Sequence, residues 1–258
     1  IELIYIKMLF LIPKYQKSKL QKTSYFLGIL FLLMSFGCED NSDQILIIDD
    51  IPINNQQKQF KILSLGDSYT IGESVCETCR FPEQLKDSLS INFKKDTTFS
   101  LQVIARTGWT TTNLINAIEQ ENITNNFDLV TLLIGVNNQF QNRDFSIYEK
   151  EFPELISTSI KAANNKRNNV IVVSIPDYAF TPFGNGNTSI SAGIDKYNDF
   201  AKSYCDQNGV TFINITDITR EGLSNTDLVA SDGLHPSKLA YTKFVERILP
   251  LAIAKLKE

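Results

Sequence analysis

The chain has 258 residues, of which 43% are hydrophobic and 21% are charged. This is enough material for one α/β domain, or two small ones, and the composition excludes a largely disordered protein. The formal net charge of −4 disfavours a nucleic-acid-binding surface, which is usually strongly basic. We therefore expect no nucleic-acid partner.

The first 37 residues have the pattern of an export signal. A lysine-rich segment at 14–22 precedes an almost entirely apolar run at 25–36, which is typical of a secretory signal. Residues 35–38, Ser-Phe-Gly-Cys, resemble a bacterial lipobox, in which Cys38 is lipidated and becomes the new N-terminus. Serine stands where such boxes usually carry leucine. An ordinary signal peptide cut nearby and an uncleaved anchor remain alternatives, although the run is short for a membrane span of about 20 residues.

These features divide the chain into three parts. We expect a lipoprotein-type signal peptide at 1–37, a flexible tether at 38–59 and a folded domain at 60–258. The acidic stretch that follows Cys38 resembles the tether of surface-exposed lipoproteins, and a plain linker explains it equally well. The expected location is the bacterial cell envelope, in the periplasm or at the outer membrane, with the lipid on Cys38 as membrane anchor.

The folded part alternates strand-like and helix-like segments. Short apolar runs predict five strands, at 60–65, 99–105, 127–134, 169–175 and 210–215. Helical patterns separate them, with a helix starting at Pro82, one around 114–118, one from a Ser146 capping box to about Ala163, one at 190–207 and a last one from Pro236. This alternation predicts a parallel sheet covered by helices on both faces. The segment 176–189 is expected to be a long loop with three aromatic residues, which is typical of a binding site.

Short polar blocks follow the first three predicted strands. They are Gly66-Asp67-Ser68, Arg106-Thr107-Gly108 and Gly135-Val136-Asn137-Asn138. Because the carboxyl ends of parallel strands share one edge of a sheet, we expect these blocks to line one crevice. A serine there needs a base to become a nucleophile, and the chain has a single histidine, His235, with Asp232 three residues before it.

Four blocks together resemble the SGNH (GDSL-type) hydrolases. They are GDSYT at 66–70, the glycine of RTGWTT at 106–111, GVNN at 135–138 and DGLHP at 232–236. The resemblance implies a three-layer α/β/α fold with a flavodoxin-like, five-stranded parallel sheet. It also implies that Ser68 is the nucleophile, His235 the base and Asp232 the residue that orients it. Ser68, Gly108 and Asn137 would form the oxyanion hole. Tyr69 and Asn138 depart from the usual leucine and aspartate.

Other interpretations of these residues stay open. Asn137 and Gly108 are also residue types that form turns, and Asp232 could instead be a charge near the start of the last helix. Trp109 is either a platform for a sugar or a packing residue, and we favour packing. Arg106 could steer an acidic substrate but is more simply a surface charge.

The cysteines allow several assignments. Cys76 and Cys79 form a disulfide, a pair of free thiols, a redox pair or half of a zinc site. No second pair of cysteines or histidines completes a zinc set, so we expect no metal. Cys205 falls in a predicted helix and is expected to pack as a small apolar residue.

The leading hypothesis is an exported serine esterase that needs no cofactor. Its substrate would be an acetylated carbohydrate or an acyl ester of the kind that lipases and lysophospholipases cleave. One alternative is a non-catalytic surface-binding lipoprotein on a hydrolase fold. The other is a thiol-redox protein, which is disfavoured because the Cys76–Cys79 motif does not directly follow a strand and open a helix.

Overall fold

A computed structural model describes residues 57–257. The expected signal peptide, the expected lipidation site Cys38 and most of the expected tether lie outside the described residues. The described part contains a parallel sheet of five strands in the order β2-β1-β3-β4-β5. The strands are β1 (Gln59–Gly66), β2 (Thr98–Ala105), β3 (Leu129–Leu133), β4 (Val170–Val173) and β5 (Thr211–Ile213). All five predicted strands are confirmed.

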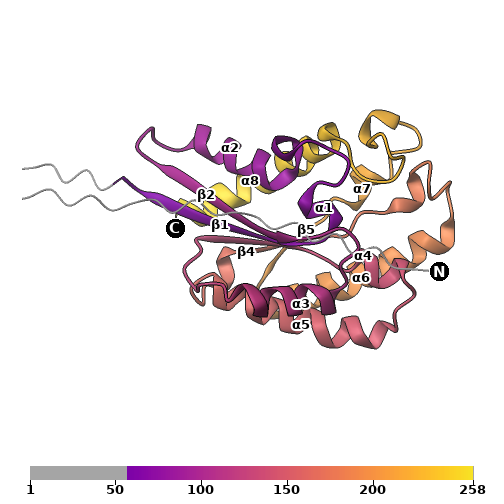
Figure 1. Cartoon of the computed structure of the whole chain (residues 1–258), viewed down its shortest axis with the longest axis horizontal. Helices are drawn as coiled ribbons and strands as arrows, with labels where there is room; N and C mark the ends of the chain where they lie inside the picture. The colour runs from indigo at the N-terminus through magenta and orange to yellow at the C-terminus, as the bar shows by residue number, and fades with distance from the viewer. Residues whose placement is uncertain (1–56, 258) are drawn as a thin grey trace, which may run out of the picture. The chain divides into compact units, whose positions relative to one another are not determined.

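Helices cover both faces of the sheet (Figure 1). Helices α2 (Phe81–Asn92) and α8 (Lys238–Lys257) pack together on one face. Helices α3 (Thr111–Glu121), α5 (Phe145–Ala162) and α6 (Thr188–Asn208) lie on the other. Every residue of β3 and β4 is buried, as expected for strands that are covered on both sides. The predicted three-layer α/β/α fold is confirmed.

Two predicted helix starts need correction. Helix α5 is capped by Asp144, whose side chain accepts the backbone N–H of Ser146 at 2.9 Å, so Ser146 is already inside the helix. Helix α8 begins at Lys238 because Pro236 pairs with Val229 in an isolated antiparallel bridge.

The predicted loop at 176–189 is also shorter than expected. It contains the 3₁₀ helix η3 (Tyr178–Phe180), and α6 begins at Thr188 with Asn187 as its cap. Two further short helices, α7 (Thr216–Thr219) and η4 (Thr226–Leu228), lie between β5 and α8. Another, η2 (Arg167–Asn169), precedes β4. Within 57–257 no helix is both long and apolar enough to cross a membrane.

The strand order places a switch point between β1 and β3. The chain runs from β1 outward to β2 and then returns to the other side of β1 to form β3. Ligands of open α/β sheets bind outside the carboxyl ends of the strands at such a point. Residues that follow β1 and β3 are therefore neighbours in space although about 70 positions separate them in sequence.

Candidate active site

Ser68 is the first residue of a one-turn helix, α1 (Ser68–Ile71), directly after β1. Asp67 caps this helix, with its Oδ1 accepting the backbone N–H of Tyr69 at 3.0 Å. The sequence predicted only a short polar block after the strand here, and no helix. The cap explains the difference, because the Asp67 side chain satisfies a backbone donor that the start of a helix leaves free.

Gly66 allows the end of β1 to approach its neighbours closely. A Cβ at this position would lie 2.2 Å from Thr70 Oγ1 and 2.3 Å from the backbone oxygen of Leu133. No other residue type fits there without a shift of the backbone. The glycine therefore keeps α1 packed against the ends of β1 and β3, which places Ser68 at the sheet edge.

A cavity of about 180 Å³ lies beside Ser68. Four of the predicted site residues line it: Ser68, Gly108, Asn137 and His235. The remaining lining residues are mainly apolar or aromatic, and they are Tyr69, Thr107, Val136, Phe140, Tyr178 and Leu234. Folding thus brings together residues that follow three different strands and a residue from the loop before α8.

Asp232 lies behind His235, with its Oδ2 2.6 Å from Nδ1 of the imidazole. Its Oδ1 accepts the backbone N–H groups of Leu234 and His235, at 2.9 and 3.0 Å. Partial burial acts to raise the pKa of Asp232, but hydrogen bonds from Ser74, His235 and these backbone groups outweigh it and hold the pKa below its usual range. The Asp232 carboxylate therefore contacts His235, whereas helix α8 begins only at Lys238. This arrangement favours a role for Asp232 in orienting His235 over a role as a charge at the start of the helix.

The imidazole of His235 also packs against the ring of Tyr69, with 5.2 Å between the ring centroids. Because the ionised Asp232 only accepts hydrogen bonds, the neutral imidazole carries its proton on Nδ1. This leaves Nε2 with a free lone pair. Within residues 57–257 the structure shows no direct hydrogen bond between His235 and Ser68 Oγ, although both side chains line the cavity.

Asn137 is held in place by the backbone of the second loop. It lies in the short helix α4 (Val136–Phe140), directly after β3, and its Nδ2 donates to the carbonyl oxygen of Trp109 at 3.1 Å. An amide nitrogen has two hydrogens, so one remains for a ligand in the cavity. Gly108 has φ +82°, and among the described residues no atom lies within 4 Å of where its Cβ would be. A side chain would have room at this position, so the left-handed backbone conformation is what favours glycine here.

The comparisons with known proteins point to one family. The chain matches the GDSL-like Lipase/Acylhydrolase family over residues 64–243, which is more than half of its length. The chain belongs to this family. It is accordingly a hydrolase that acts on ester bonds. Comparison with the curated proteins gave no match.

Solved structures agree with this GDSL-like fold. An α/β hydrolase from the metagenome of Lake Arreo, Spain, is 17% identical with a TM-score of 0.59, covering 78% of this chain and 98% of that one. A lipolytic G-D-S-L protein from Veillonella parvula is 18% identical with a TM-score of 0.57, covering 74% and 97%. An acetylxylan esterase from Geobacillus stearothermophilus is 18% identical with a TM-score of 0.55, covering 75% and 94%. At these identities the similarity concerns the fold alone.

The two positions where this GDSL-like hydrolase departs from the common pattern have clear structural roles. Asn138 is fully buried, accepts the backbone N–H of Thr111 at 3.0 Å and donates to its hydroxyl at 2.7 Å. It therefore ties α4 to the start of α3. Tyr69 is buried and packs against His235. Trp109 packs against the core and does not line the described cavity, which favours the packing interpretation.

Two groups of residues near the site were not identified from the sequence. Phe140, Tyr178 and Phe183 form an aromatic rim, with ring centroids 5.8 to 6.3 Å apart. The aromatic residues of the predicted loop at 176–189 hinted at part of this rim.

The second feature is a single residue, Ser74, whose Oγ donates to Asp232 Oδ2 at 2.6 Å. No sequence pattern signals this contact, because 158 positions separate the two residues.

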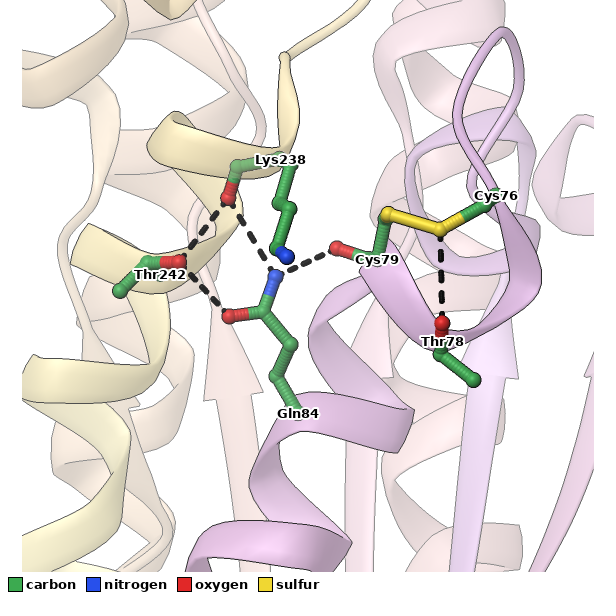
Figure 2. Close-up of a disulfide and its surroundings, with 6 residues drawn as sticks. All are labelled: Cys76, Thr78, Cys79, Gln84, Lys238 and Thr242. Atoms are coloured by element: carbon green, nitrogen blue, oxygen red, sulfur yellow. Dashed lines mark hydrogen bonds between the residues drawn. A yellow bond between two sulfur atoms is a disulfide. The ribbon is translucent and has the colours of Figure 1, made fainter.

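The predicted cysteine pair is a disulfide in the structure. Cys76 and Cys79 are joined in the loop between α1 and α2 (Figure 2). Cys76 precedes the 3₁₀ helix η1 (Glu77–Cys79), and Cys79 is its last residue. This loop follows a helix and not a strand, so the redox motif lacks its usual setting. Cys205 is buried in α6 as predicted, and burial raises the pKa of its thiol to about 12. Within 57–257 no group of three or more potential ligands is placed to hold a metal ion.

Proposed function

We propose that this hydrolase is an exported serine esterase with the triad Ser68, His235 and Asp232. The observation that carries the proposal is the cavity that Ser68, Asn137, Gly108 and His235 line together, with Asp232 on the far side of the imidazole. These are the groups that acyl transfer requires, and they come from four distant segments. A structural turn motif would not need to gather them around one cavity.

The reaction begins at the hydroxyl of Ser68. Oγ bonds to the carbonyl carbon of the ester while its proton passes to Nε2 of His235. The carbonyl π electrons move to oxygen, and Asp232 stabilises the imidazolium through Nδ1–H. When the intermediate collapses, the alcohol leaves with the proton from His235 and Ser68 holds the acyl group. A water molecule then attacks in the same way and releases the acid.

Three donors would stabilise the oxyanion. They are the backbone N–H groups of Ser68 and Gly108 and the free amide hydrogen of Asn137. The bond from Asn137 to the Trp109 carbonyl fixes the amide before substrate arrives. Such preorganised donors stabilise the charge as it forms and need no rearrangement during the reaction.

The cavity favours an ester with a short apolar acyl group. Its walls include Val136, Phe140 and Leu234, and the aromatic rim extends from it. A cavity of about 150 Å³ holds a six-carbon ring in other proteins, so about 180 Å³ suits an acyl chain of similar size. We therefore favour an acyl ester over an acetylated carbohydrate.

Export and lipid attachment are part of the same proposal. The supporting observations are the signal-like pattern at 1–37, the lipobox-like Cys38 and the disulfide between Cys76 and Cys79. Disulfides persist mainly in oxidising compartments. A Cys38→Ala variant should lose both incorporation of labelled fatty acid and partition into the membrane fraction. Labelling that is unchanged would refute the lipid anchor.

The catalytic proposal is tested with a fluorophosphonate probe and a panel of p-nitrophenyl esters. Ser68→Ala and His235→Ala should abolish ester cleavage and labelling while their circular dichroism spectra stay unchanged. Ser90→Ala, which removes an exposed hydroxyl on α2, is the matched control and should behave as the parent. Near-normal turnover of Ser68→Ala would refute the triad.

The same assays address the alternatives. No labelling and no turnover of any ester by the parent protein would favour the non-catalytic binding protein. Rates should be highest for butyryl to octanoyl esters and low on acetylated xylan. The reverse order would favour a carbohydrate acetyl esterase.

A further inference from the structure

The carboxylate of Asp232 receives more hydrogen bonds than its role toward histidine requires. Its Oδ1 accepts two backbone N–H groups, and its Oδ2 lies 2.6 Å from both His235 Nδ1 and Ser74 Oγ. Because the ionised carboxylate can only accept, the Ser74 hydroxyl must be a donor. One oxygen therefore holds the catalytic imidazole and a serine from a distant loop at the same time.

The loop that carries Ser74 is anchored to the nucleophile. The backbone N–H groups of Gly72 and Glu73 both donate to the carbonyl oxygen of Ser68, each at 3.0 Å. Ser74 itself has φ 65°, a left-handed conformation that is uncommon for a residue other than glycine. The loop is thus turned back from α1 toward Asp232, in a backbone conformation that the surrounding contacts must maintain.

The far end of the same loop is tied to the helix that follows His235 (Figure 2). The Cys76–Cys79 disulfide closes residues 76–79, just after Ser74, into a small ring. Gln84 on α2 donates to the carbonyl oxygens of Cys79 and Lys238 and accepts from Thr242 Oγ1 at 2.8 Å. The loop is therefore connected both to Ser68 and to the first turns of α8.

The side chain of Asp232 is 29% exposed, so water competes for its oxygens. A mobile carboxylate would leave the imidazole free to rotate out of line with Ser68. Charge-assisted hydrogen bonds are stronger than neutral ones. A donor on a loop that is anchored to Ser68 by backbone hydrogen bonds also loses less freedom than a water molecule would. Ser74 is placed to restrict the carboxylate to the orientation in which Oδ2 meets Nδ1.

We propose that Ser74 is a positioning residue of the triad, and that its hydroxyl holds the Asp232 carboxylate in line with His235. This inference rests on the proposed function. It predicts that loss of the hydroxyl lowers kcat and leaves KM unchanged, because Ser74 does not line the cavity beside Ser68. The expected loss is roughly tenfold, the effect of a single well-placed hydrogen bond.

The test uses the full-length protein with two substitutions at one position. Ser74→Ala removes the hydroxyl and keeps the Cβ, so the backbone strain stays as in the parent. Ser74→Gly removes the hydroxyl and also relieves the left-handed backbone. If the hydroxyl matters, both variants lose kcat to a similar extent. If only the backbone conformation matters, Ser74→Ala keeps parental kcat and only Ser74→Gly changes it, which would overturn the inference. Thr78→Ala removes a hydroxyl from the same loop without a contact to Asp232 and should keep parental kcat.

A second arm asks whether Ser74 acts through Asp232. In an Asp232→Ala background, Ser74→Gly should cause no further loss, whereas independent effects would multiply. A full tenfold loss in that background would overturn the inference. A failure of the proposed triad can be told apart from a failure of this inference. If the triad is wrong, Ser68→Ala keeps its turnover, whatever the result at Ser74.

Discussion

Asp67, next to the proposed nucleophile, offers the most quantitative prediction about stability. Its side chain is fully buried, and within the described residues its Oδ2 has no hydrogen-bond partner. Burial raises the pKa of Asp67 from an ordinary 3.8 to about 8, and the hydrogen bond from Tyr69 N–H only partly offsets this. The folded protein therefore keeps a proton on Asp67 at neutral pH that the unfolded chain has released.

The sign of the pH dependence follows from proton linkage. Between pH 3.8 and 8 the folded state binds one proton more than the unfolded state at this site. The stabilisation that this raised pKa provides is fully present below pH 3.8, the pKa of Asp67 in the unfolded chain. It is lost as the pH rises through about 8, the pKa of Asp67 in the folded protein. The free energy of unfolding thus falls by about 1.4 kcal/mol per pH unit from this group alone. From pH 5 to pH 7 the fall amounts to about 2.7 kcal/mol.

The perturbation is Asp67→Asn. An amide keeps the Oδ1 acceptor for Tyr69 N–H and does not titrate. Urea unfolding, followed by circular dichroism at pH 5, 6 and 7, gives the free energy of unfolding of both proteins. The free energy of unfolding of the variant minus that of the parent should grow by about 2.7 kcal/mol from pH 5 to pH 7. The contributions of all other titratable groups are the same in both proteins and cancel in this difference. Asp96→Asn, at an exposed position, should follow the parent. A difference that stays constant with pH would refute the buried protonated carboxyl.

Three further predictions concern the site and its support. Asn137→Ala should lower kcat on the order of 10²–10³-fold through loss of an oxyanion donor; steady-state kinetics that show less than a threefold change would contradict this. Gly135→Ala should reduce the free energy of unfolding by roughly 2 kcal/mol or more, because Gly135 has φ +126° and its new Cβ would lie 2.7 Å from the Tyr148 ring; an unchanged urea midpoint would count against it. Arg220→Ala should cost about 2 kcal/mol in the same assay, since Arg220 Nε lies 2.9 Å from the buried Asp177 carboxylate. That carboxylate also accepts from Ser191 Oγ at 2.7 Å and from a backbone N–H at 3.0 Å, and a neutral result would show that these two donors satisfy it alone.

The sheet could be predicted because its signal is local. Buried strands such as β4 appear as continuous apolar runs, and each run is recognisable from neighbouring residues. Predicted boundaries were less accurate. The run 127–134 extends beyond β3, because Phe127 and Ile134 are buried without belonging to the strand.

The short elements of the site could not be predicted in the same way. Helices α1 and α4 have four and five residues, too few to show a helical period. The sequence showed only short polar blocks after the strands at both places. Their caps and close contacts, such as that of Asp67 with Tyr69 N–H, decide the conformation, and these depend on how the strand ends are packed.

By itself, the sequence determined the parallel α/β architecture, the set of polar blocks at the strand ends and the pairing of Asp232 with His235. These depend on periodicity and on residues a few positions apart, where chain connectivity already limits the geometry. Tertiary structure decided the shape and apolar lining of the cavity, the aromatic rim and the contact of Ser74 with Asp232. Such contacts join loops that are far apart in the chain, and only the packing of helices on the sheet sets the distance between them.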